Sequence, residues 1–219
     1  LIGFFNIIGS LAAGVIGYFV IVRSTAFAAH ALAHIGLPGA TGAVLLGLPV
    51  TLGLAVFCVG GAVVIGALGR RAGDREVATG TVLAFATGLG LYFSSQATRS
   101  SSTMTNVLFG NLLAISSQQL IVFAAFLIGV VVVISVVHRP LLFASVDEQV
   151  ARSRRVPVRP LSVLFMVLLG LVVTMSVQVV GTLLLFALVV TPAATAIMLT
   201  PRPGRAIGIS LILNLVAVW

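Results

Sequence analysis

The chain has 219 residues, of which 60% are hydrophobic and only 7% are charged, and its formal net charge is +8. A soluble domain carries about 25% charged residues, so this composition excludes an ordinary soluble enzyme or nucleic-acid-binding domain. Because all 12 basic residues are arginines, the lysine of the P-loop G-x-x-x-x-G-K-[ST] is missing, and the chain cannot hydrolyse ATP by that route.

The apolar residues form runs of roughly 20, the length that crosses a hydrocarbon core about 30 Å thick. About eight such segments predict an all-α, polytopic integral membrane protein with a single transmembrane domain over residues 1–219. In chain order they are Leu1–Val22, Thr25–Gly47, Val50–Gly69, Val77–Ser95, Gln119–His138, Leu161–Val177, Val180–Thr200 and a short run from Arg205. The first run lacks a Met and a basic flank, and the last is short, so we expect that part of the protein is missing at one or both ends.

The arginines give the orientation. Eleven of the 12 arginines and all four acidic residues lie in the stretches that follow the first, third, fifth and seventh segments. These stretches are Arg23, Arg70–Glu76, Arg139–Pro160 and Pro201–Arg205. Eight crossings place all of them on one side, which the positive-inside rule identifies as the cytoplasm.

The long cytoplasmic loop, Arg139–Pro160, has the pattern of a short polar helix. Ser145 and Glu148 fit the capping box S-x-x-E. Acidic residues at its start, Asp147 and Glu148, and arginines from Arg152 onward suit the helix dipole. The residues alone leave two interpretations open, a solvated connector or a helix that docks on a cytosolic partner.

The second segment carries His30 and His34, followed by Pro38. Residues i and i+4 share a helix face, so both imidazoles can face one ligand. Pro38 has no N–H and leaves the carbonyl of His34 without its helical partner. The stripe could serve a passing divalent cation, or both histidines could hydrogen-bond to neighbouring helices. One chain offers too few ligands for tetrahedral zinc, whereas a two-fold dimer with this helix on its axis would gather four histidines.

Four stretches, in order, resemble motifs of the permease subunits of zinc and manganese ABC importers, the ABC-3 metal-uptake family. VIVRSTAFAAHALAHIGLPGA resembles V-V-L-R-R-x-A-F-x-G-D-A-L-S-H-A-x-L-P-G, and VLFGNLLAIS resembles L-F-G-x-L-L-A-V-S. VDEQVARSRRVPV is similar to F-D-E-E-x-A-R-A-x-G-V-x-V, and VVGTLLLFALVVTPAATAIML to V-V-G-x-L-L-V-x-A-L-L-V-x-P-A-A-T-A. The resemblance covers nearly the whole chain.

This resemblance implies a homodimeric permease of the bacterial cytoplasmic membrane, with the loop 139–160 on the cytoplasmic side. It implies cytosolic ATPase subunits and an extracytoplasmic metal-binding protein as partners, while this chain binds no cofactor and does no chemistry itself. The loop helix would be the coupling helix that contacts the ATPase. Its residues would be Asp147, Glu148, Val150, Ala151 and Arg152.

Three departures from the family pattern bear on the transported ion. The family's intramembrane Asp is His30 here, the Gly and Ser around it are Ala29 and Ala33, and the Gly after the coupling helix is Arg155. Imidazole suits zinc, whereas carboxylate oxygens suit manganese, so the sequence predicts zinc first and manganese second. The alternatives are a permease for metal chelates or a vitamin, a channel or carrier without an ATPase, and an inactive copy.

Overall fold

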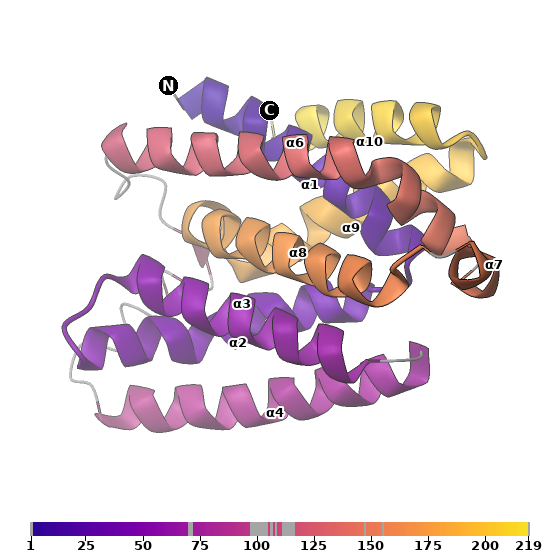
Figure 1. Cartoon of the computed structure of the whole chain (residues 1–219). Coiled ribbons are helices and arrows are strands. Elements are labelled where there is room, and N and C mark those ends of the chain that lie inside the picture. Colours follow the sequence, from indigo (N-terminus) through magenta and orange to yellow (C-terminus); the bar gives the residue numbers. More distant parts are fainter. Residues whose placement is uncertain are drawn as a thin grey trace. The chain divides into compact units, whose positions relative to one another are not determined.

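The computed structural model describes residues 2–69, 72–96, 105, 107, 109–110, 117–146, 148–154 and 156–218. Its regular structure within these residues is entirely helical (Figure 1). The helices are α1 (Ile2–Val22), α2 (Ala26–Leu45), α3 (Val50–Leu68), α4 (Ala72–Gln96), α6 (Ser117–Val146), α7 (Glu148–Ser153), α8 (Val158–Val180), α9 (Thr182–Leu199) and α10 (Pro203–Val218). Apart from the short α7, they correspond one to one with the predicted apolar segments, which confirms the all-α fold class.

Four of the described helices are long and apolar enough to cross a membrane: Val50–Leu68, Gly73–Gln96, Ile121–Ser145 and Val158–Val180. Shorter apolar helices cover Ala12–Val22, Leu184–Leu199 and Pro203–Ala217. The chain is therefore a polytopic membrane protein, and the total of eight crossings stays a prediction.

The turn between α1 and α2 is a Schellman motif. The N–H of Thr25 donates to the carbonyl of Val20 over 2.8 Å, and the N–H of Ser24 donates to that of Ile21 over 3.0 Å. Ser24 has a φ of +52°, a left-handed conformation that glycine normally supplies. The same motif ends α2, where Gly47 takes this place with a φ of +68°.

The chain divides into two compact units, and helices α8 and α9 each contribute to both. Unit 1 comprises Leu1–Ala26, Ile115–Ser162 and Ala187–Trp219, and unit 2 comprises Phe27–Ala114 and Val163–Phe186. The prediction of one transmembrane domain over residues 1–219 stays a prediction.

Unit 1 is built around α1, which packs against α6 and α10. Phe19 of α1 and Phe123 of α6 are almost fully buried in its core. Contact with α9 is so close that a Cβ on Gly17 would lie 2.2 Å from the carbonyl oxygen of Val189. Small residues at such crossings are the usual means of close helix packing in membranes, because lipid supplies no hydrophobic drive between helices.

Unit 2 has a comparable crossing between α2 and α3. A Cβ on Gly39 would lie 2.2 Å from the carbonyl oxygen of Gly53, and one on Gly53 would lie 2.0 Å from that of Gly39. Cys58 of α3 is fully buried, and its thiol donates to the carbonyl of Leu32 over 3.5 Å. The crossing therefore joins α3 directly to the helix that carries both histidines.

The predicted loop helix is present as α7, but the capping box predicted at its start is wrong. Helix α6 does not end at His138 but continues through Pro140 to Val146, because the residues after the proline are apolar and suit a helix. Ser145 lies inside α6, where its hydroxyl donates to the carbonyl of Leu141 over 2.5 Å. Ser145 is therefore not the N-cap residue of α7, which the predicted capping box requires.

The remainder of the loop is also more helical than predicted. Helix α7 begins at Glu148, after Asp147, which lies outside the described residues. Pro160 is in the first turn of α8, where a missing N–H loses no intrahelical hydrogen bond. The region Arg139–Pro160 is thus the end of α6, the short α7 and the start of α8.

Candidate functional site

Helix α2 brings His30 and His34 together. Their ring centroids are 4.7 Å apart, with the ring planes at 67°. The spacing of four residues gives this arrangement because it corresponds to about one helical turn. The prediction that both imidazoles share a face is confirmed.

The ring of Phe186 in α9 packs against the ring of His30. Its ring centroid lies 4.9 Å from that of His30, with the planes at 71°, an edge-to-face contact. Sequence reasoning missed Phe186, because one more aromatic residue in an apolar run carries no sign of its tertiary partner. The contact restricts the rotation of the His30 ring and shields it on one side.

One ring nitrogen of this pair is left without a partner. Nδ1 of His30 is buried and has no hydrogen-bond partner among the described residues. A buried polar group without a partner is costly, and imidazole nitrogens are common metal ligands. For this nitrogen, the alternative prediction of a hydrogen bond to a neighbouring helix finds no support in the described part of the chain.

The two histidines do not form a complete metal site by themselves. No group of three or more His, Cys, Asp or Glu side chains suited to a metal ion occurs in the described residues. A four-coordinate ion needs two further donors, which could be carbonyl oxygens, water or groups from another molecule. Because two histidines do not complete the coordination of an ion, they suit transient binding better than permanent binding.

The carbonyl oxygen of His34 is one candidate donor, because Pro38 has no N–H to bond it. Pro38 lies inside a continuous α2. The neighbouring carbonyl of Leu37 accepts a 3.0 Å hydrogen bond from the hydroxyl of Thr41. On α4, a Cβ at Gly90 would lie 3.2 Å from the Pro38 ring, so a glycine makes room for the proline.

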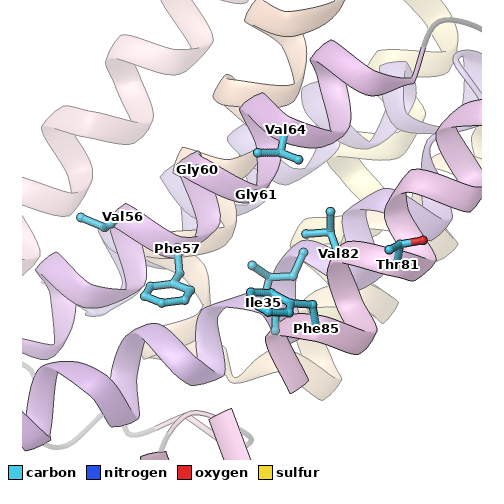
Figure 2. A pocket seen from close by; sticks show the side chains of 10 residues that line it. Ile35, Val56, Phe57, Gly60, Gly61, Val64, Thr81, Val82 and Phe85 are labelled. Atoms are coloured by element: carbon cyan, nitrogen blue, oxygen red, sulfur yellow. The ribbon is translucent and has the colours of Figure 1, made fainter. Parts of the chain in front are cut away.

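An open pocket of about 510 Å³ also lies in unit 2 and is lined by α2, α3 and α4 (Figure 2). Ile35, Phe57, Val64 and Phe85 are among its apolar lining residues, and the lining contains no titratable side chain. Its polar side chain is Thr81, whose hydroxyl donates to the carbonyl of Val77 over 2.9 Å. The pocket therefore offers no carboxylate, imidazole or thiolate to a metal ion and is predominantly apolar.

The predicted coupling residues lie on or beside α7, which packs against α6. Ala151 is fully buried, whereas Val150 is 44% exposed. Glu148 and Arg152 have a helical backbone, and their side chains lie outside the described part of the structure. Asp147 lies outside it entirely. α7 thus anchors one face on its own unit and presents Val150 outward.

The all-helical fold of the described residues, with four helices of membrane-spanning length, defines a polytopic membrane protein. The model of the ABC 3 transport family matches residues 4–219, and the chain belongs to this family. The family resemblance predicted from the four motifs is confirmed, and the chain is a permease of the metal-uptake ABC transporters.

Three similar proteins support this assignment. The manganese transport system membrane protein MntC of Halalkalibacterium halodurans is 33% identical over 197 residues, covering 90% of this chain and 68% of the relative. The manganese import system permease protein ScaB of Streptococcus parasanguinis is 32% identical over 195 residues, covering 85% and 66%. The solved structure of PsaBC from Streptococcus pneumoniae in complex with Fab has a TM-score of 0.83 and 30% identity, covering 98% of this chain and 78% of that chain.

Proposed function

We propose that this permease is the membrane-spanning subunit of an ATP-driven importer of divalent transition-metal ions, and that His30 and His34 bind the ion transiently during transport. The observation that carries this proposal is the pair of imidazoles 4.7 Å apart with a buried, unpartnered Nδ1 among the described residues. The sequence predicts that α2 crosses the membrane, and ionisable residues within membrane segments are rare and usually functional.

For the ion itself we propose zinc, because two imidazole nitrogens suit zinc better than manganese. Manganese is the second candidate, and the names of MntC and ScaB favour it. With manganese, the carbonyl of His34 and water would be the preferred donors, since this ion favours oxygen.

The remaining parts follow from the family. Two copies of the chain would stand in the bacterial cytoplasmic membrane with residues 139–160 on the cytoplasmic side. An extracytoplasmic binding protein would deliver the ion, and cytosolic ATPases would contact α7 through Val150 and its neighbours. ATP would be hydrolysed in those subunits, and this chain would bind no cofactor.

Metal content of whole cells tests the proposal. Cells without the gene, cells with it restored, and cells carrying His30→Ala/His34→Ala are grown with limiting metals and measured by mass spectrometry. His138→Ala is the matched control, because this exposed histidine contacts only the carbonyl of Ser135 among the contacts described. We expect zinc to fall on deletion and to be restored by the control but not by the double variant, at equal membrane levels.

The other outcomes separate the parts of the proposal. A fall in manganese instead of zinc would select the second ion. Restoration of uptake by the double variant would refute the histidine path and leave the family assignment intact. No change in any transition metal would refute metal import, and the chelate and inactive-copy alternatives would then gain weight.

A further inference from the structure

Arg23 follows α1 and connects three helices of unit 1. Its Nη1 donates to the hydroxyl of Ser145 in α6 over 3.3 Å, and its Nη2 donates to the hydroxyl of Ser162 in α8. All three residues belong to the same compact unit. The two serines flank α7, one in the helix before it and one in the helix after it.

The hydrogen bonds are chemically consistent. The hydroxyl of Ser145 gives its hydrogen to the carbonyl of Leu141, so its lone pairs remain for Arg23. A guanidinium is a planar fork with five donors, which allows it to bond two acceptors on different helices at once. Lysine, with one compact ammonium on a flexible stem, cannot hold two separate helices in the same fixed geometry.

The surroundings of Arg23 differ from those of an arginine that only marks the cytoplasmic side. Such an arginine extends its charged end into water. Arg23 is instead half-buried, its Nε is completely buried, and both terminal nitrogens bond protein hydroxyls. The guanidinium of Arg23 therefore binds groups of the protein instead of extending into water.

The backbone around Arg23 is hydrogen-bonded to the end of α1. Thr25 closes the end of α1 twice, since both its N–H and its hydroxyl donate to the carbonyl of Val20, over 2.8 and 3.1 Å. Helix α2 begins at the next residue, Ala26. Arg23 therefore lies three residues before the start of the helix that carries both histidines.

We propose that Arg23 is a positioning residue that transmits movement of α7 to the joint between α1 and α2. The inference rests on the proposed function, in which α7 contacts the ATPase and α2 carries the ion. When a nucleotide moves α7, the ends of α6 and α8 move with it, and the two serines draw Arg23 along. Without this link, ATP hydrolysis and ion movement are no longer coupled.

The test uses the whole transporter, with its ATPase and binding protein, in liposomes. Zinc or manganese uptake and ATP hydrolysis are measured in parallel for Arg23→Ala, Ser145→Ala/Ser162→Ala and the control Arg202→Ala, whose arginine is exposed. We expect Arg23→Ala and the double serine variant to keep ATP hydrolysis and to lower ions moved per ATP about tenfold, a usual size for coupling between sites. Arg202→Ala should match the wild type, and Arg23→Lys should recover only part of the ratio.

A second measurement does not depend on transport. Nitroxide labels on cysteines introduced at Ser24 and at the exposed Ser153 of α7, in a Cys58→Ala background, report the distance between the joint and α7. We expect ATP to shift this distance, and Arg23→Ala to broaden its distribution and remove the shift.

The results distinguish the two proposals. If the wild-type complex moves no metal, the proposed function fails. If it moves metal and Arg23→Ala keeps the normal ratio of ions to ATP, the coupling role is refuted. Equal losses of hydrolysis and uptake would also refute it, because they indicate damage to the fold.

Discussion

The crossing of α2 and α3 offers a sharp test of how this fold is held together. Gly53→Ala places a methyl group 2.0 Å from the carbonyl oxygen of Gly39 and 2.7 Å from the Cβ of Ala43. Carbon and oxygen normally approach no closer than about 3.3 Å, so the helices must separate or bend. Overpacking of this kind costs about 1–3 kcal/mol.

A second glycine on α3 isolates this effect. A Cβ on Gly60 meets no atom within 4 Å, and alanine is about 1 kcal/mol better than glycine inside a helix. Both substitutions gain the same helix propensity. The difference between their free energies of unfolding therefore measures only the steric cost at the crossing of α2 and α3. We expect Gly60→Ala to be neutral or stabilising and Gly53→Ala to be less stable than it by about 1–3 kcal/mol.

Unfolding by SDS in mixed micelles, followed by circular dichroism, gives both stabilities. The two variants are compared with the wild type in the same detergent, because lipid and detergent alter the absolute values. Equal stabilities for Gly53→Ala and Gly60→Ala would show that the two backbones do not touch at Gly39, and the account of this crossing would then be wrong.

Two further predictions concern single side chains. Ser24→Gly should stabilise the protein by about 1 kcal/mol, since a left-handed residue with a Cβ costs about that much; a lower unfolding midpoint in the same SDS assay would contradict the Schellman motif. Cys58, which is fully buried, should react with a maleimide only after unfolding, as mass spectrometry of the intact chain would show. Labelling in the folded state, at a rate similar to that of a cysteine introduced at Ser24, would contradict the burial of Cys58.

The helices were largely predictable because a membrane imposes their length and polarity on the sequence. The exception is the end of α6, which was expected at His138, two residues before Pro140. An apolar stretch follows that proline, and the helix continues to Val146. The predicted segment ended where Arg139 interrupts the apolar run, although Leu141, Leu142 and Phe143 resume it.

Only the part of the candidate site that depends on residues close together in the sequence was predictable. His30 and His34 share a face because they are one turn apart, which the sequence states directly. The bonds of Arg23 to Ser145 and Ser162 join residues 122 and 139 positions apart. A single sequence gives no means of pairing such residues, since arginine at a helix end and serine in an apolar run are each ordinary by themselves.

The order of residues along α2 has a consequence for how this protein can change. Two contacts fix the later part of this helix: Pro38 lies against Gly90 of α4, and Gly39 lies against Gly53 of α3. His34 lies one turn before Pro38. One residue inserted between His34 and Pro38 would rotate the histidines by about 100° relative to those contacts. Insertions and deletions should therefore be excluded from this short interval. If the histidines bind the ion as proposed, a relative could change its ion preference here only by substitution.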